Sequence, residues 1–565
     1  MGHEISQQTT PAPGVSRRGF LGRAGGLAAS TVAAGALTAL PVGDALSSSA
    51  AADAVTAPTA VQRADAAYAL RVAAARYEHA RPLPPHPTNG DEERYAATRI
   101  ASFSKGLPHN ERGEVDAAAY SALLAALDSG QPAAFEAIPL GGKAKLANPQ
   151  AAYAFLLEGP DPQCLATDPP PAFDSAQEAG EMVEMYWQAL ARDVPFARYD
   201  ADPLIATAAA DLSRLSDFRG PKAGGSVTPA TVFRGGVPGD LTGPYLSQFF
   251  WLPVPYGPLK MAQQYPIVPP KDHLTTFAEW LNVQQGRYKA PKPAANASPP
   301  PTRYLSAGRD LAAYLHVDFT YQAFLNAALI LNKLAVDSLG AALDAGNPYL
   351  HSKTQTGGPT FGVHHLLDLV ARVAAPALRA VFYQKWLVHR RLRPEEFGGR
   401  VHTHMTGAAQ YPIHKDLLST SHVLDAVHQK YGTYLLPLAD PEGCPMHPSY
   451  PAAHVVIAGA CATVLKAYFN EDFVLPAPVV ASTDGRALLP YSGPALTVGG
   501  ELNKLAGNQL MARAWEGFHW RSDSVAALKL GEELAIGILA DERRTYHEAF
   551  GGFTLTRFDG TTVTV

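Results

Sequence analysis

Apolar residues recur at three- and four-residue steps over much of the chain, which is typical of helices. Strand patterns are sparse and short. The most regular helical run comprises Tyr314, Val317, Tyr321, Phe324, Ala328 and Leu331. Further leucines widen its apolar face, so we expect one core helix buried nearly all round. The same periodicity predicts helices near residues 62–77, 117–127, 175–190, 364–374, 377–392, 454–469 and 503–515.

The best strand signal lies at the C-terminus, in residues 553–565. Two runs rich in Thr and Val are separated there by Asp559-Gly560, which is the composition of a hairpin turn. The predicted fold is therefore mainly α, a large helical-bundle domain with long loops and a minor C-terminal β-hairpin.

A proline-rich segment, residues 289–303, is the clearest linker and contains Pro299-Pro300-Pro301. It would separate an N-terminal elaboration from a C-terminal half that holds every cluster of candidate catalytic residues. The chain has 565 residues with 48 Gly and 48 Pro, so its length allows two to four domains or one large domain with long loops. We predict a single large domain over residues 53–565.

The first 52 residues have the pattern of a twin-arginine export signal. Arg17-Arg18 precedes an Ala- and Gly-rich apolar stretch, and small residues follow. Gly25, Gly35 and Pro41 make that stretch a poor membrane helix, and no later run approaches the ~18 apolar residues that a membrane span requires. We expect export to the cell envelope or beyond, or a cytoplasmic location if the signal is vestigial.

Charge and cysteine content exclude several classes of function. Lys and Arg total 46 against 51 Asp and Glu, a net charge of −5 without a basic run, which excludes a nucleic-acid binder. The cysteines, Cys164, Cys444 and Cys461, form no C-x-x-C pair. A disulfide scaffold and a cysteine-built metal site are both disfavoured, and the expected role of each cysteine is that of a small buried hydrophobe.

Basic residues are concentrated in two short segments. In the first, Lys385 precedes Arg393 by eight residues, and Pro394 should end the helix that carries Lys385 at Arg393. Taken alone, this segment also fits a solvated helix face. In the other, Arg513 precedes His519 by six residues, and the two converge only if the helix breaks, for which Gly517 offers the place.

Between them lies a proline-rich turn, His447-Pro-Ser-Tyr-Pro-Ala-Ala-His454, that leads into an apolar helix. The first turn of a helix has free backbone N–H groups, so an anion can bind at this point. Each histidine alone would also fit a structural role. The three segments together predict a pocket for an oxyanion.

In this order, the three segments resemble the vanadium-dependent haloperoxidases and their acid-phosphatase relatives. The Lys-to-Arg spacing of eight and the paired histidines of the turn are similar to the algal bromoperoxidases and to bacterial homologues from meroterpenoid, napyradiomycin-like pathways. The pattern covers residues 385–523, and the helix that begins at Arg309 also looks family-like. The resemblance thus implies the helical fold of that family for most of the mature chain.

The resemblance also implies roles for the pocket residues. His519 would be the axial ligand of vanadate, His454 the acid–base residue on the opposite face, and His447 the second histidine of the algal pattern. The residues that would bind the equatorial oxygens of vanadate or phosphate are Lys385, Arg393 and Arg513.

The chain departs from the family turn, Pro-Ser-Gly-His, at two positions. Ala452 lacks the serine hydroxyl that would bond an equatorial oxygen, a loss of about 1.5–3 kcal/mol. Ala453 replaces a glycine, and we expect its methyl group to obstruct the approach of the backbone or to forbid the backbone angles required. Vanadate binding should therefore be weakened.

The function predicted from these departures is isomerisation without vanadate. The resemblance implies an enzyme of meroterpenoid antibiotic biosynthesis that shifts the prenyl chain of a prenylated hydroxynaphthoquinone, an α-hydroxyketone, without a cofactor or metal. Lys385, Arg393 and Arg513 would stabilise the developing oxyanion, and crowding among them favours neutral Lys385. The candidates for proton transfer are His454, His447, His519 and Lys385.

Three alternatives remain open from the sequence. A vanadium-dependent haloperoxidase that uses hydrogen peroxide would tolerate the two alanines and bind vanadate through His519. A phosphatase would use His454 or His519 as its nucleophile, and a non-catalytic homologue would only bind its ligand. Phosphate or another anion would also fit the pocket. The expected partners are a small apolar aromatic substrate and a second copy in a possible homodimer, with no nucleic acid and no stable membrane span.

Overall fold

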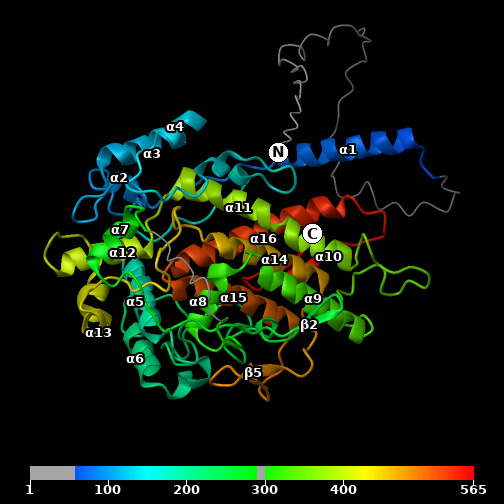
Figure 1. Ribbon diagram of the computed structural model, residues 1–565. Helices are drawn as coiled ribbons and strands as arrows, with labels where there is room; N and C mark the ends of the chain where they lie inside the picture. The colour runs from blue at the N-terminus through cyan, green and yellow to red at the C-terminus, as the bar shows by residue number, and fades with distance from the viewer. Residues whose placement is uncertain (1–56, 289–298) are drawn as a thin grey trace, which may run out of the picture. The chain divides into compact units, whose positions relative to one another are not determined.

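Helices dominate the computed structural model, which describes residues 57–288 and 299–565 (Figure 1). This confirms the predicted mainly α fold. The described residues fall into two units that divide between Ala67 and Tyr68, and the larger one, Tyr68–Val565, holds the site described below. The helices are α1 (Ala60–His79), α2 (Asp91–Arg94), α3 (Ala117–Ser129), α4 (Pro132–Glu136), α5 (Ala176–Ala191), α6 (Pro203–Leu212), α7 (Phe277–Gln284), α8 (Gly308–Val317), α9 (Gln322–Asp337), α10 (Val363–Arg372), α11 (Ala374–Tyr383), α12 (Pro394–Met405), α13 (Val423–Tyr431), α14 (Ala453–Tyr468), α15 (Val498–Glu516) and α16 (Arg521–Arg543).

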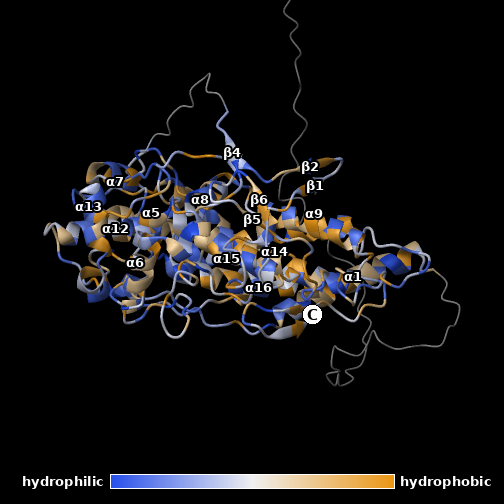
Figure 2. Cartoon of the chain, turned by 90° about the horizontal axis from the view of Figure 1, so that it is seen from below, coloured by the Kyte–Doolittle hydropathy of each residue, from blue (hydrophilic) through white to orange (hydrophobic). Residues whose placement is uncertain are grey.

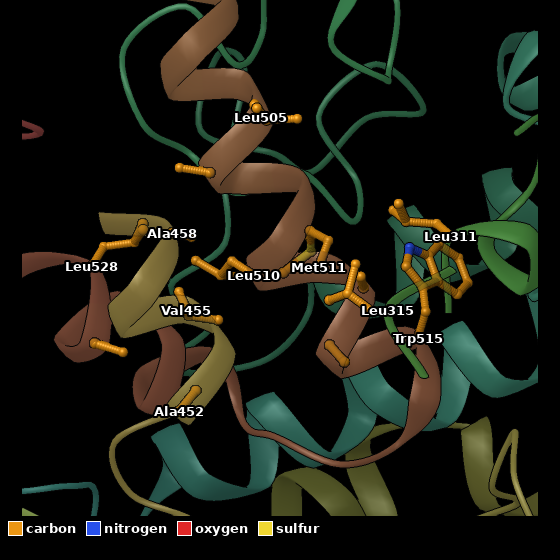
Figure 3. Packing of buried hydrophobic residues seen from close by; sticks show 14 of the residues in the cluster. Leu311, Leu315, Ala452, Val455, Ala458, Leu505, Leu510, Met511, Trp515 and Leu528 are labelled. Carbon is orange, nitrogen blue, oxygen red and sulfur yellow. The ribbon is translucent and has the colours of Figure 1, made fainter. Parts of the chain in front are cut away.

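The core of the larger unit is built on α14, α15 and α16. Helix α14 is rich in Ala and Val, is buried along nearly its whole length, and is largely orange in the hydropathy view of Figure 2. Figure 3 shows Val455 and Ala458 of α14 facing Leu510 of α15, with Leu528 of α16 close by. Tight packing of this kind holds the N-terminus of α14 in a fixed position.

The predicted single helix through Tyr314 and Leu331 is wrong, because the chain breaks between α8 and α9. The backbone N–H of Asp318 bonds the carbonyl of Tyr314 and closes α8, and Asp318 then turns to an extended conformation. Val317 is 80% exposed, whereas the periodic pattern had placed it in the core. Both helices bury an apolar face, so the periodicity continues across a break that it does not reveal.

The helix that carries Lys385 ends earlier than predicted. Lys385 lies in a short π-helical segment, Gln384–His389, that follows α11, and Arg390 then adopts a left-handed conformation with φ 36°. Arg393 is extended, as expected before proline, but Pro394 opens α12 instead of ending the helix before it. Arg393 therefore lies at a helix entry.

The predicted break at Gly517 is confirmed. Helix α15 ends at Glu516, Gly517 has φ 87°, and α16 begins at Arg521. The left-handed conformation is one that glycine adopts without steric cost. His519 thus lies on the bend between the two helices.

Strands are short and form two-stranded antiparallel sheets. The predicted C-terminal hairpin is present, with Leu555 opposite Val563 and Gly560 in the turn at φ 85°. The pairs are β1 (Val254–Tyr256) with β2 (Leu259–Met261), β3 (Tyr265–Pro266) with β4 (Thr302–Arg303), β5 (Val479–Ala481) with β6 (Leu488–Pro490), and β7 (Thr554–Thr556) with β8 (Thr562–Thr564).

Several predictions fall partly outside the described residues. The export signal within residues 1–52 lies outside them, as do residues 289–298 of the proline-rich segment. The end of that segment forms β4, and the predicted domain boundaries and linker role stay predictions.

The three cysteines are free, and Cys164 is only partly buried. No helix in the described part of the chain is long and apolar enough to span a membrane.

Candidate active site

Arg393 joins the three sequence segments in one buried cluster. Its Nε donates to the carbonyl oxygen of His447 at 2.9 Å, and one terminal nitrogen donates to the carbonyl oxygen of Phe518 at 2.9 Å. That nitrogen also reaches Nε2 of His519 at 2.8 Å, and the other terminal nitrogen reaches Nδ1 of His447 at 2.9 Å. The predicted convergence of these segments is therefore present in the structure.

The hydrogen bonds of His519 fix its tautomer. An arginine can only donate, so Nε2 of His519 must carry the lone pair that accepts from Arg393. Nδ1 then carries the proton and donates to Asp523 Oδ2 at 3.0 Å. Burial, with the charges of Arg393 and Lys385, holds the pKa of His519 well below its usual range. A neutral imidazole with a carboxylate on one nitrogen and a lone pair on the other is the arrangement of a metal ligand.

Lys385 is fully buried beside Arg393. Its Nζ donates to the carbonyl oxygens of Pro448 and Ser449, each at 2.7 Å, and in its ammonium form it has a third N–H for another acceptor. Burial and the charge of Arg393 lower the pKa of Lys385 well below its usual range. An anion in the cluster would offset that effect by favouring the ammonium form.

Arg513, in the last turn of α15, is the third basic residue of the cluster. One terminal nitrogen donates to Glu516 at 3.0 Å, whereas its buried Nε has no partner among the described residues. Burial raises the pKa of Glu516 to about 8, although Arg513 acts in the opposite sense. A buried guanidinium with an unused donor is suited to an anionic ligand.

His454 lies in the first turn of α14 and faces a cavity. Its Nε2 lies 3.2 Å from Asp318 Oδ1, and its side chain is 20% exposed. Burial and the charge of Arg513 lower the pKa of His454, and Asp318 partly opposes them. The cavity has a volume of about 330 Å³ and is lined by both His454 and Arg513 together with Leu315 and Phe518.

A second histidine, His316, borders the same cavity. Its ring lies 3.3 Å from Asp440 and 3.0 Å from Glu442. The hydrogen bond to Glu442 is the main reason that the pKa of His316 rises to about 9, so this side chain is cationic at neutral pH. The cavity therefore carries charges of both signs around its apolar lining.

The N-terminus of α14 supplies further donors. Ala452 is the N-cap residue, without a side-chain cap, and its own N–H donates to the carbonyl oxygen of Asp523 at 3.0 Å. Among the described residues, the backbone N–H groups of Ala453 and His454 have no backbone acceptor. Unpaired N–H groups and the positive end of the helix dipole favour an anion here.

Ala453 has an ordinary helical backbone conformation. It is the first residue of α14 and is not among the residues with positive φ, so its conformation is open to any L-residue. The expected effect of the Ala453 methyl group on anion binding stays a prediction. Ala452 still lacks the hydroxyl, and that difference stands.

The donor set fits a tetrahedral oxyanion. Three cationic side chains, the free N–H groups of α14 and the lone pair of His519 belong to the same cluster. The pKa of His447 is also lowered, first by burial and then by Arg393 and Lys385. A bound anion would reduce the repulsion among these cations.

The sequence analysis missed several residues that contact the cluster or border the cavity. Asp523 follows His519 by four residues at the start of α16, so the spacing alone could have indicated their contact. Asp318 is brought to His454 by the break after α8, which no pattern signalled. The other residues that sequence reasoning missed are Arg391, Glu516, His316, Asp440 and Glu442.

Comparison with known proteins gives consistent results. A family model described as the VCPO second helical-bundle domain matches residues 419–547. A vanadium-dependent bromoperoxidase of Ascophyllum nodosum is 35% identical over 510 residues, covering 86% of this chain and 90% of that protein. A vanadium-dependent bromoperoxidase of Corallina pilulifera is 33% identical over 597 residues, covering 89% of this chain and 98% of its own length.

Among solved structures, a second vanadate-dependent bromoperoxidase (AnII) of Ascophyllum nodosum, a homohexamer, superposes with a TM-score of 0.83. It is 29% identical in sequence, and the match covers 93% of this chain and 94% of that one. The similarity thus extends over both the site-bearing half and the residues before it.

Proposed function

Because the chain belongs to the vanadium-dependent haloperoxidase family, we propose that it binds vanadate and uses hydrogen peroxide to oxidise a halide. The observation that carries this proposal is the buried ring of His519: its Nδ1 donates to Asp523, and the lone pair of its Nε2 faces Arg393 in the cationic cluster. This arrangement has no evident use in a protein that only needs a stable core, since burying several cationic side chains together is costly.

The residues present fit vanadate with one donor fewer than the family turn supplies. Nε2 of His519 would bind the vanadium, and the oxygens would be held by Lys385, Arg393, Arg513 and the N-terminus of α14. Bound vanadate supplies a Lewis-acid centre that activates hydrogen peroxide for two-electron oxidation of the halide. The missing donor is the hydroxyl absent at Ala452.

His454 would move the proton in this reaction. Its lowered pKa keeps the ring neutral, so it is able to accept a proton from hydrogen peroxide as that molecule binds. Asp318 holds Nε2, leaving Nδ1 for the reactants, and stabilises the imidazolium once it forms. Arg393 and Lys385 would hold the oxyanion, and their complete burial limits access of water.

The test is reconstitution of metal-stripped protein with orthovanadate. We expect about one bound vanadium per chain by elemental analysis, and bromination of a dye only when vanadate, peroxide and bromide are all present. His519→Ala should lose both the bound vanadium and the bromination, whereas Cys461→Ser, at a buried site on α14 outside the cluster, should keep both. Stoichiometric vanadium without halide oxidation would refute the proposal.

Ala452 favours a second candidate, the isomerase predicted from the sequence. Without the hydroxyl, vanadate is held less firmly, and the same cations would then stabilise an oxyanion of the substrate. A histidine would take the proton of the tertiary alcohol, the prenyl carbon would move with its bonding electrons to the neighbouring carbonyl carbon, and the former ketone oxygen would gain a proton. Metal-stripped protein should convert a prenylated α-hydroxyketone naphthoquinone into an isomer of unchanged mass; a strict need for vanadate and peroxide would refute it.

Assembly and location are also proposals. A relative is a homohexamer, and we propose that this chain forms a homo-oligomer with at least two copies. Light scattering coupled to gel filtration would test this, and a monomer at micromolar concentration would contradict it.

We also propose export through the twin-arginine signal. The test is to fuse the first 52 residues to a reporter protein, with Arg17-Arg18 either kept or changed to Lys-Lys.

A further inference from the structure

A buried arginine lies behind His519, on the side away from the lone pair. Arg391 donates to Asp523 Oδ1 at 2.6 Å and to the hydroxyl of Ser522 at 2.9 Å. Its other terminal nitrogen donates to Glu178 on α5. Asp523 uses its second oxygen to accept the proton of His519, so Arg391 and His519 hold the two ends of one carboxylate.

The backbone of Arg391 reinforces this contact. Its carbonyl oxygen accepts the N–H of Ser449 at 2.9 Å, and the hydroxyl of Ser449 donates to Asp523 Oδ2. The Trp520 N–H also donates to that oxygen at 3.2 Å, and the Arg391 guanidinium lies 4.8 Å from the centre of the Trp520 ring. Asp523 is therefore held from several directions, and its carboxylate has little freedom to rotate.

The charges around Arg391 are unequal. Three carboxyl groups, those of Asp523, Glu178 and Glu181, share this one arginine, and all four side chains are at most 3% exposed. Burial raises the pKa of Glu178 well above its usual range, and that of Glu181 is raised for the same reason, with Arg391 opposing both shifts. Arg391 therefore links the Asp523 carboxylate, which accepts the proton of His519, to the two glutamates of α5.

We infer that Arg391 is a positioning residue for His519: it orients the Asp523 carboxylate so that Nδ1 of His519 keeps its proton and Nε2 faces the bound oxyanion. This inference rests on the proposed function for the identity of the anion, but the tautomer of His519 is a property of the chain itself. Substituting the hydrogen-bond partner of a metal-binding histidine typically lowers metal affinity about 10- to 100-fold.

The key variant is Arg391→Lys, which keeps the charge but loses the planar fork that reaches both Asp523 and Glu178. Its matched control is Arg521→Lys. Arg521 is a buried arginine on α16 that pairs with Glu184 on α5, so it joins the same two helices without touching Asp523. Ser449→Ala, which removes one donor to Asp523, is a milder second variant should Arg391→Lys fail to fold.

The first measurement is the tautomer of His519 in metal-stripped protein labelled with 15N-histidine, assigned by the signal lost in His519→Gln. The wild type and Arg521→Lys should show the proton on Nδ1, and Arg391→Lys should show a mixture of tautomers. The second measurement compares the dissociation constants of orthovanadate and inorganic phosphate. Arg391→Lys should weaken vanadate about tenfold and phosphate much less, because phosphate binds through the cations without a bond to His519.

The outcomes separate the two proposals. An unchanged tautomer in a folded Arg391→Lys or Ser449→Ala protein would overturn the positioning role. An equal loss of vanadate and phosphate binding in Arg391→Lys and Arg521→Lys would overturn it as well, because it would reveal a general structural effect. If the wild type binds no vanadate, the proposed function fails, and the tautomer of His519 still decides the role of Arg391.

Discussion

Restoring a hydroxyl at position 452 tests the proposed site most directly. Ala452 is fully buried and is the N-cap of α14, a position at which serine is strongly favoured. A serine oxygen there would accept an N–H from the first turn of α14, while its proton would remain free for an oxygen of the anion. The substitution Ala452→Ser thus adds two interactions that are measured separately.

The two interactions have different magnitudes. Capping should stabilise the protein without ligand by about 0.5–2 kcal/mol, seen as a higher melting temperature. A hydrogen bond to a charged group contributes about 1.5–3 kcal/mol. At about 1.4 kcal/mol per decade, vanadate should bind about 10- to 100-fold more tightly to Ala452→Ser than to the wild type.

Titration of metal-stripped protein with orthovanadate measures the affinity, and a thermal melt without ligand measures the cap. Ala453→Gly is the matched control, because its backbone is helical and gains nothing from glycine, while the helix loses at most about 1 kcal/mol. A higher melting temperature with unchanged vanadate affinity in Ala452→Ser would refute the reasoning. A larger gain of affinity in Ala453→Gly would show that the methyl group, and not the missing hydroxyl, limits binding.

Three further predictions concern the groups around the cavity. The Glu516 carboxyl, with its pKa raised to about 8, is neutral below that pH and competes with a bound anion for Arg513 above it. Phosphate affinity, measured by calorimetry, should therefore fall about tenfold as pH rises past 8 in the wild type. It should not fall in Glu516→Gln. Asp318→Asn removes the charge that raises the pKa of His454, so the pH profile of turnover should shift to lower pH. Turnover at pH 7 should fall about tenfold. An unshifted profile would contradict the role of Asp318 as the partner of His454. His316, with a folded pKa of about 9 against about 6.5 unfolded, stabilises the fold fully below pH 6.5 and loses that effect as pH rises through 9. The melting temperature of the wild type should therefore fall between pH 7 and 10 by more than that of His316→Gln.

The fold class was predictable because most helices bury one continuous apolar face. The prediction failed where two such helices follow each other in phase. Val317 continues the periodicity of Tyr314 but is exposed, since Asp318 ends α8 there. Pro394 misled in another way: its effect on Arg393 was predicted correctly, yet proline also opens a helix, and it does so here.

The cluster itself was largely predictable, because its members come from segments with unusual spacing and chemistry. Its supporting carboxylates were harder to find. Asp523 is near His519 in sequence, whereas Glu178 lies on α5, more than two hundred residues before Arg391. Contacts of that kind depend on tertiary packing, and a buried carboxyl group leaves no local pattern that distinguishes it from a solvated one.

The two candidate functions differ in what must balance the charge of the cluster. The cluster contains the guanidinium groups of Arg393 and Arg513, and the N-terminus of α14 adds a positive partial charge. Ala452 removes one neutral donor from this set and none of the cations, so the attraction for an anion is reduced but not removed. An enzyme working without a permanent anion would have to keep these cations buried and uncompensated between turnovers, which is costly. On this argument the cluster is better suited to a resident oxyanion, and the isomerase becomes the stronger candidate only if Ala452→Ser is found to restore a binding that the wild type lacks.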